Sequence, residues 1–195
     1  MTQLAILEQV LHQFAGIDAE HFALSAPYWQ PRTYKKGEFY NEYKNVCKHL
    51  GFIFDGLFRT YYVNDATGEE RNVFFFGKNQ VIVAYKSFME QSPCNYYTES
   101  MVGSTILYIH YDHLQLLYQT SHQWERFGRL VAEQGFATIM NRTEDTLFKT
   151  PEQRYLNLVE AHPDIFSMIP LYHIASYLDI QGPSLSRIRK RISGK

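Results

Sequence analysis

The character of the chain changes at His110. From about Tyr28 to that point aromatic and β-branched residues dominate, and turn-forming pairs interrupt them roughly every 8 to 12 residues. Beyond it the turn signals become sparse, and apolar residues recur at helical spacing. Short strands with frequent turns are typical of antiparallel barrels and sandwiches, so we expect an α+β chain in which an antiparallel β-roll precedes helices. Asp55-Gly56, between two strand-like runs, gives the strongest hairpin signal.

Helices are also expected before the β-rich part. The first predicted helix ends at Gly16, and Asp18 is placed to cap a second, short helix. The inner face of the first helix carries apolar residues at helical spacing: Leu4, Leu7, Leu11 and Phe14. The opening segment lacks a basic region of the kind that starts a signal peptide, and Glu8 interrupts its apolar pattern.

A long helix is predicted from Ser121 to Phe148, and its apolar residues cover more than one face. Such a helix either lies within one core or packs on a partner, and we expect a second copy of the chain to cover it. The residues assigned to this dimer interface are Trp124, Phe127, Leu130, Val131 and Gln134. After Lys149, the run Thr150-Pro151-Glu152-Gln153 has the pattern of a capping box at the start of the next helix.

The C-terminal segment 169–195 has the spacing of a helix-turn-helix. Its first helix is expected from Leu171, its turn at Asp179, where a residue that tolerates left-handed backbone is needed, and its second helix from about Gly182-Pro183. Five basic residues and no acidic one lie between Ile180 and Lys195, in a chain of net charge −1. Phosphate attraction needs such a local excess. The residues that we expect to contact DNA are Ser184, Ser186, Arg187, Lys190 and Arg191.

Composition excludes several other classes of protein. The chain has only two cysteines, Cys47 and Cys94, which argues against a zinc ribbon or a disulfide framework and for a reducing, cytoplasmic location. No apolar run approaches the roughly 20 residues of a membrane helix, so no membrane association is expected. The aromatic content of 16% and hydrophobic content of 45% indicate a globular protein. We expect no metal and no cofactor.

The order of helix pair, β-roll, long helix and IASYLDIQGPSLSRIRKRI resembles the Crp/Fnr family of bacterial transcription regulators over essentially the whole chain. The run YKKGEFY followed by CKHLGFIFDGLFRTYYV is similar to the start of the family's cyclic-nucleotide-binding roll. The run ERFGRLVAEQGF resembles the dimer helix of the branch common among Bacteroidetes. The resemblance implies a sensor roll over 1–120, a dimerisation helix over 121–148 and a helix-turn-helix domain over 149–195. It also implies a homodimer on an inverted repeat of double-stranded DNA, with an effector in the roll.

The chain departs from this family where cyclic AMP would bind. Ala84 stands where the family has a Glu for the ribose, and Cys94-Asn95 stands where it has an Arg-Ser pair for the phosphate. Loss of a charge-assisted contact of this kind lowers the binding free energy of the nucleotide by about 1.5 to 3 kcal/mol. We therefore expect an unknown small-molecule effector other than cyclic AMP, or none. The candidate effector pocket consists of Ala84, Tyr85, Lys86, Cys94 and Asn95.

The predicted recognition helix departs from the family as well. Pro183 stands where the family has a cytosine-reading Glu, and it has no group that reads a base. Arg187 falls on the family's guanine-reading Arg, and Ser184 on a hydroxyl that contacts phosphate. The resemblance thus implies that this helix reads bases of the DNA, but that position 183 takes no part in the readout.

Three other interpretations remain open. The chain could be a dimeric ligand sensor or scaffold that no longer binds DNA, which depends on whether the basic helix is exposed. A cupin-like metalloenzyme would need clustered histidines, and His110 with His113 is the nearest approach. Cys47 and His49 could form a nucleophile–base pair, although a buried thiol beside a satisfied His is the commoner case. We favour a regulator that is not an enzyme.

Overall fold

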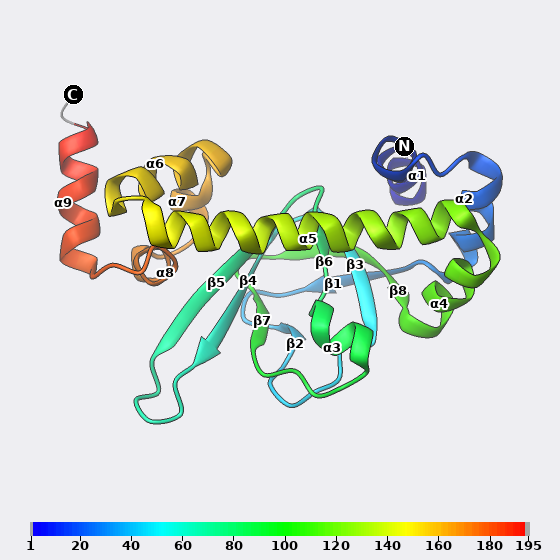
Figure 1. Ribbon diagram of the computed structural model, residues 1–195, viewed down its shortest axis with the longest axis horizontal. Coiled ribbons are helices and arrows are strands. Elements are labelled where there is room, and N and C mark those ends of the chain that lie inside the picture. The colour runs from blue at the N-terminus through cyan, green and yellow to red at the C-terminus, as the bar shows by residue number, and fades with distance from the viewer. Residues whose placement is uncertain (1, 194–195) are drawn as a thin grey trace.

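Two helices and a short 3₁₀ turn precede the strands in the computed structural model, which describes residues 2–193 (Figure 1). They are α1 (Gln3–Ala15), α2 (Ala19–Ser25) and η1 (Ala26–Tyr28). Gly16 ends α1 in the left-handed conformation at φ 72°, and the side chain of Asp18 caps α2, as predicted. Eight strands follow: β1 (Gln30–Tyr34), β2 (Phe39–Asn41), β3 (His49–Asp55), β4 (Leu57–Val63), β5 (Glu70–Gly77), β6 (Val81–Ile82), β7 (Tyr97–Ser100) and β8 (Ser104–His110).

The strands form two four-stranded antiparallel sheets, in the orders β1-β8-β3-β6 and β2-β7-β4-β5. A short helix, α3 (Tyr85–Glu90), lies between β6 and β7. The expected α+β fold with an antiparallel β-roll is therefore confirmed.

The hairpin predicted at Asp55-Gly56 is wrong. β3 pairs with β6 and β8, whereas β4 pairs with β5 and β7, so the two strands joined at Gly56 belong to different sheets. Gly56 has φ 110°, and a Cβ there would clash with Ser104. The chain thus turns a corner, and the hydroxyl of Ser104 accepts the N–H of Leu57 at 3.3 Å. The long hairpin is β4–β5, whose turn spans residues 64–69.

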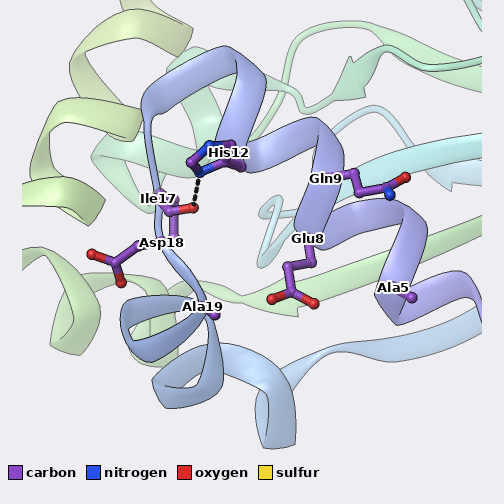
Figure 2. A pocket seen from close by; sticks show the side chains of 7 residues that line it. All are labelled: Ala5, Glu8, Gln9, His12, Ile17, Asp18 and Ala19. Atoms are coloured by element: carbon purple, nitrogen blue, oxygen red, sulfur yellow. Dashed lines mark hydrogen bonds between the residues drawn. The ribbon is translucent and has the colours of Figure 1, made fainter.

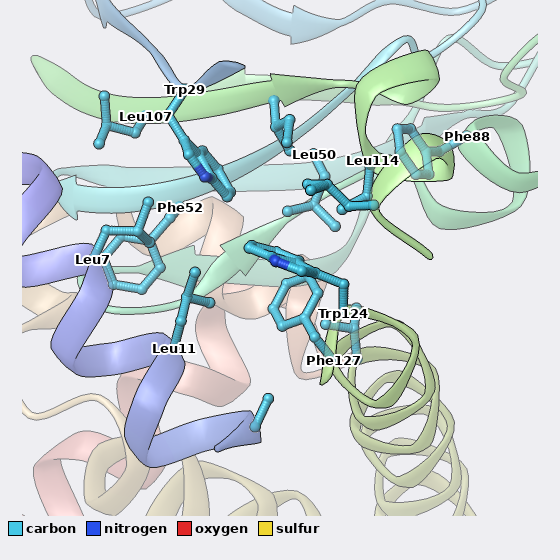
Figure 3. Packing of buried hydrophobic residues seen from close by; sticks show 14 of the residues in the cluster. Leu7, Leu11, Trp29, Leu50, Phe52, Phe88, Leu107, Leu114, Trp124 and Phe127 are labelled. Carbon is cyan, nitrogen blue, oxygen red and sulfur yellow. The ribbon is translucent and has the colours of Figure 1, made fainter. Parts of the chain in front are cut away.

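The first core lies where α1 and α2 meet one face of the roll, α4 (Tyr111–Thr120) and the start of α5 (His122–Phe148). Figure 3 shows Trp124 and Phe127 of α5 facing Leu11 and Leu50 within this cluster. Both aromatic side chains have no exposed surface, and the indole N–H of Trp124 donates to the carbonyl of His21 at 3.0 Å. The assignment of Trp124 and Phe127 to a dimer interface is therefore wrong, since their own chain covers them. Val131 is also buried there.

The second half of α5 is different because it extends past the roll with its apolar residues uncovered (Figure 1). Leu130 is half-buried, and Gln134 is exposed. The large apolar side chains that are exposed on this half are Phe136, Ile139, Met140, Leu147 and Phe148. α5 therefore has a first half that is packed within the chain and a second half that presents an apolar surface.

Four helices complete the chain at the end opposite to α1: α6 (Pro151–Ala161), α7 (Ile165–Met168), α8 (Leu171–Tyr177) and α9 (Gly182–Ser193) (Figure 1). The capping box of Thr150 and Gln153 at the start of α6 is present as predicted. α8 and α9 form the expected helix-turn-helix, with Asp179 in the turn at φ 53°. Its core contains Ile174, Ala175, Leu178, Leu185 and Ile188.

Candidate functional site

The candidate nucleic-acid interface is the outer side of α9. Leu185 and Ile188 bury one side of this helix, which leaves Ser186, Arg187, Lys190 and Arg191 exposed and Ser184 half-buried. The five residues predicted to contact DNA therefore lie on one helix, away from its core. Lys195, which contributes to the basic excess, lies outside the described residues.

α9 starts at Gly182, as expected, and Gln181 caps it. The carbonyl of Gln181 accepts the N–H groups of Ser184 and Leu185, so Gln181 is the capping position and Pro183 the second residue of the helix. The N–H groups of a first helical turn have no partner within the helix. The missing N–H of Pro183 therefore costs α9 no hydrogen bond. The helix forms despite the departure from the family's sequence.

The basic side chains of α9 differ in how they are held. The guanidinium of Arg191 forms an ion pair with Glu152 of α6. Arg187 makes only a long contact, from Nε to the carbonyl of Pro183 at 3.4 Å. Arg189 lies over the ring of Phe166 at 5.4 Å and belongs to the inner side. Arg187 and Lys190 are thus the exposed cations of α9 that the structure presents without a strong ion pair among the described residues.

The structure brings together only part of the candidate effector pocket. Lys86, Cys94 and Asn95 line a cavity of about 130 Å³ beside α3, together with Ser87, Glu90, Ser92, Pro93 and Tyr96. Ala84 does not line this cavity, because it is buried in the first core as the residue before α3. Tyr85 is part-exposed and does not line it either. Pockets for small molecules usually measure about 300 to 1,000 Å³, so this cavity is small for a nucleotide.

Neither cysteine is set up as a nucleophile. Burial raises the pKa of the Cys94 thiol and also that of the Cys47 thiol. Cys47 Sγ contacts the carbonyl of His49 at 3.3 Å rather than the imidazole. Burial and the neighbouring His110 lower the pKa of His49 to about 4. The arrangement is that of a buried thiol and not of a nucleophile–base pair.

A second cavity, of about 470 Å³, lies between α1 and the start of α2 (Figure 2). Two of its polar residues, His12 and Asp18, stabilise the fold: His12 Nδ1 bonds to the carbonyl of Ile17 at 3.1 Å. Asp18 accepts from the N–H of His21 at 2.9 Å and from the Gln123 amide at 2.7 Å. These hydrogen bonds hold the pKa of Asp18 well below its ordinary value. Of the groups that line the cavity, His12 and Asp18 therefore already have partners within the fold, and the sequence did not single the cavity out.

The histidines named for a metalloenzyme do not form a metal site. His110 Nδ1 lies 3.3 Å from a carboxylate oxygen of Asp112, and the ring of His113 stacks on Tyr28 with centroids 4.2 Å apart. Within residues 2–193, no group of three or more His, Cys, Asp or Glu residues could hold a metal ion. None of the helices over the same residues has the length and apolar character to cross a bilayer.

Comparison with known proteins decides what kind of fold this is. No protein-family model and no curated protein matches the chain. Among solved structures, FixK2 from Bradyrhizobium japonicum has a TM-score of 0.75 at 12% identity, over 85% of each chain. A protein described as a Crp/Fnr-family transcriptional regulator from Eubacterium rectale has a TM-score of 0.74 at 15% identity, over 96% of this chain and 89% of the other.

CLP of Xanthomonas campestris, a global regulator that responds to cyclic di-GMP, has a TM-score of 0.69 at 16% identity. The similarity covers 91% of this chain and 92% of CLP. The chain has the fold of Crp/Fnr regulators. These neighbours are transcription regulators and not enzymes, and at this level of identity they establish the fold alone.

Proposed function

We propose that this protein is a transcription regulator of the Crp/Fnr family, in the branch common among Bacteroidetes, that acts in the cytoplasm as a homodimer on an inverted repeat. The observation that carries the proposal is α9, whose outer side presents Ser186, Arg187, Lys190 and Arg191 at the end of the molecule farthest from α1 (Figure 1). A basic helix on the second position of a helix-turn-helix is placed to enter a major groove. The proposed division of the chain is a sensor roll over 1–120, a dimer helix over 121–148 and a DNA-binding domain over 149–195.

The proposed dimer surface is the apolar second half of α5. Ile139 and Met140 lie three and four residues after Phe136, so the three side chains share one stripe. Leu147 continues this stripe, whereas Gln134, two residues before Phe136, lies on the opposite side of the helix with Thr138. A second copy related by a two-fold axis would cover the stripe with the same residues, which is how most homodimers close. It would also place two α9 helices at opposite sides of the axis, about 34 Å apart on successive major grooves.

Within this dimer, the positions on α9 differ in their proposed roles. Arg187 is placed to read a guanine with two hydrogen bonds, and Ser184 to contact a phosphate. Lys190 and Arg191 lie further along the helix and are assigned to phosphates, where Arg191 would exchange Glu152 for DNA. Pro183 cannot read a base, so little cytosine preference is expected at its position.

The roll is proposed to bind an effector other than cyclic AMP or cyclic GMP, or none. Ala84 is buried among apolar side chains, and the cavity beside Cys94 and Asn95 offers Lys86 as its only cation. Titration calorimetry with either nucleotide should therefore give no binding at micromolar concentration. Micromolar affinity would show that the pocket chemistry has been misassigned.

The test of the function is an operator selection on random duplex DNA, followed by titrations at several salt concentrations. We expect an inverted repeat with half-sites one helical turn apart. Arg187→Ala should weaken binding to the selected site by about 1 to 3 kcal/mol and relax selectivity at one base pair. Lys190→Ala should weaken selected and scrambled duplexes equally and reduce the salt slope by about one. Arg129→Ala, which removes an exposed arginine of α5, is the matched control.

Two outcomes would contradict these roles. Equal loss on both duplexes for Arg187→Ala would make Arg187 a phosphate contact. Absence of any enriched sequence would favour the second candidate, a dimeric sensor or scaffold that has kept the fold without DNA binding. The observation that supports this second candidate is the ion pair of Arg191 with Glu152, because it engages one of the exposed basic side chains of α9.

A further inference from the structure

The cavity between α1 and the start of α2 has the size of a binding site for a small molecule (Figure 2). It measures about 470 Å³, and pockets of this kind usually measure about 300 to 1,000 Å³. One wall is a face of α1 whose residues share spacings of three and four, and the other wall is the connection to α2. The lining residues are Ala5, Glu8, Gln9 and His12 on α1, and Ile17, Asp18 and Ala19 on the other wall. We name this hollow the α1–α2 cavity.

Hydrogen bonds hold the walls of the α1–α2 cavity in place. Gly16 ends α1 at φ 72°, and Nδ1 of His12 bonds to the carbonyl of Ile17 at 3.1 Å. The N–H of Asp18 donates to Oε1 of Gln123 at 2.8 Å, and the Gln123 amide returns a hydrogen bond to Oδ2 of Asp18 at 2.7 Å. Ile17 has no exposed surface. A ligand would therefore meet a preformed cavity and would lose little free energy in ordering it.

Glu8 is a charged residue of the cavity that the fold does not use. It is half-buried, and among residues 2–193 its carboxylate has no hydrogen-bond or ion-pair partner. Partial burial weakens the hydration of a carboxylate, and no positive charge of the described chain compensates for it here. A cation in the cavity would supply the missing interaction.

The neighbouring polar groups have free acceptor positions. A carbonyl oxygen only accepts, so Nδ1 of His12 carries the proton in its bond to Ile17, and Nε2 of the neutral ring is an acceptor. Oδ1 of Asp18 accepts from the N–H of His21 at 2.9 Å and bonds to the ring of His21 at 2.8 Å. Among the described residues, Oδ2 of Asp18 accepts only from Gln123, which leaves it one acceptor position. The cavity thus offers mainly acceptors.

The composition of the lining indicates the charge of a ligand. Its ionisable residues are Glu8, Asp18 and His12, and no lysine or arginine of the described chain lines the cavity. A metal ion is not indicated, since residues 2–193 contain no group of three or more His, Cys, Asp or Glu that could hold one. An ammonium group carries a positive charge and three donors, which match a lining of acceptors. The apolar remainder of the lining is suited to the carbon chain of an amine.

We propose that the α1–α2 cavity binds a protonated aliphatic amine, with the ammonium group on Glu8 and the carbon chain against Ile17 and Ala19. Figure 2 shows Glu8 and Asp18 on either side of Ala19, so a diamine has a second carboxylate within the same cavity. The reciprocal bonds between Asp18 and Gln123 connect this cavity to the first turn of α5. The ligand site is therefore separate from the roll and needs neither DNA nor a second chain.

Titration calorimetry on the full chain tests the proposal with butylamine and with putrescine, the four-carbon diamine. At pH 8 an aliphatic amine is protonated and an ordinary imidazole is neutral. We expect both amines to bind, and the uncharged butanediol not to bind. Glu8→Gln keeps the shape of the side chain but removes its charge, so it should weaken the binding of both amines at least about tenfold. Glu20→Gln is the matched control, because this exposed carboxylate lies on α2 and does not line the cavity.

Two further variants distinguish the cavity from the negative charge around it. Ala5→Leu and Ala19→Leu leave every charge in place and fill the cavity from its two walls, so each should abolish binding. Thermal unfolding of each variant shows whether its fold is intact. Ala19 is exposed, so its replacement by leucine does not disturb the first core.

Absence of binding by both amines at millimolar concentration would overturn the proposal. It would also be wrong if the two leucine variants bind amines as the parent does, or if Glu20→Gln weakens binding as much as Glu8→Gln. The amines would then respond only to the local negative charge. None of these measurements uses DNA, so their outcome is independent of the proposed function.

Discussion

The two halves of α5 have similar apolar content and opposite surroundings. In the first half, Trp124 and Phe127 are fully buried by α1, α2 and the roll of the same chain. In the second half, Phe136 is 67% exposed, Leu147 68% and Phe148 80%. The apolar pattern of a helix thus shows which residues avoid water, but it does not show whether the cover comes from the same chain or from another.

The largest expected effect separates the two halves directly. Trp124→Ala should destabilise the protein by about 3 to 5 kcal/mol, because it leaves a cavity in the first core. Leu147→Ala, which truncates an exposed side chain on the same helix, should change the unfolding free energy of the monomer by about 0.5 kcal/mol or less. Urea denaturation at submicromolar protein concentration measures both. Similar losses for the two variants would abolish the distinction between the halves.

Self-association should respond in the opposite sense. Ile139→Asp places a carboxylate within the apolar stripe and should weaken dimerisation by about 100-fold, since a charge at the centre of an interface must be desolvated. Its monomer should unfold like the parent monomer. Thr138→Asp adds the same charge to an exposed residue on the opposite side of the helix and serves as the control. Sedimentation across a dilution series would contradict the assignment if both variants associate equally.

Acid should also distinguish the two ends of α5. Burial and the charges of Arg59 and Lys36, opposed by Glu70, lower the pKa of His173 to about 4 from 6.5. The fold holds this ring neutral, with Nδ1 3.0 Å from Nη1 of Arg59, so the stabilising contribution of His173 is complete above about pH 6.5 and is lost as the pH falls toward 4. At the other end, Asp18 has a lowered pKa and keeps its bond to Gln123 throughout that range.

Amide hydrogen exchange in segment 171–178, which contains α8, should therefore rise between pH 7.5 and pH 5 after correction for intrinsic rates, while exchange in segment 122–131 of the first core stays constant. In the His173→Phe variant the corrected exchange of segment 171–178 should no longer depend on pH. A dependence that persists in this background would assign the acid response to another group.

The smallest effect concerns how α5 begins. The side chain of Ser121 accepts the N–H of Trp124 at 3.4 Å and caps the helix. Ser121→Ala should lower the unfolding free energy by about 1 kcal/mol. It should leave the dimer dissociation constant unchanged, because the cap belongs to the packed half. A change in dissociation constant as large as that of Ile139→Asp would mean that the halves are not independent.

Local hydrogen-bonding chemistry explains which parts of the fold the sequence predicted well. The caps at Asp18 and Thr150 and the left-handed turn at Asp179 depend on residues within a few positions of one another. Asp55-Gly56 has the local signal of a hairpin, but whether a turn joins paired strands or two sheets depends on Ser104, which lies across the roll.

The contact between Arg59 of β4 and His173 of α8, 3.0 Å between Nη1 and Nδ1, shows the same limit. Arg59 and His173 are separated by 114 positions, and nothing in either neighbourhood indicates the other. The α9 residues were predictable because one amphipathic helix contains them all. The small cavity was predictable only in part, since Lys86, Cys94 and Asn95 line it while Ala84 turns into the core.

The contact of Ser176, a residue of α8, with the backbone of the edge strand β5 has a consequence for solubility. An uncovered edge strand can pair with the strand of another molecule, and proteins usually block such edges. Here the N–H of Asn72 and the carbonyl of Glu70 are blocked by the hydroxyl of Ser176, which belongs to α8. A molecule in which α8 has opened locally would present this edge to its neighbours until α8 returns. A long-lived open state would therefore allow strands of different molecules to pair. A high concentration of open molecules would lead to aggregation.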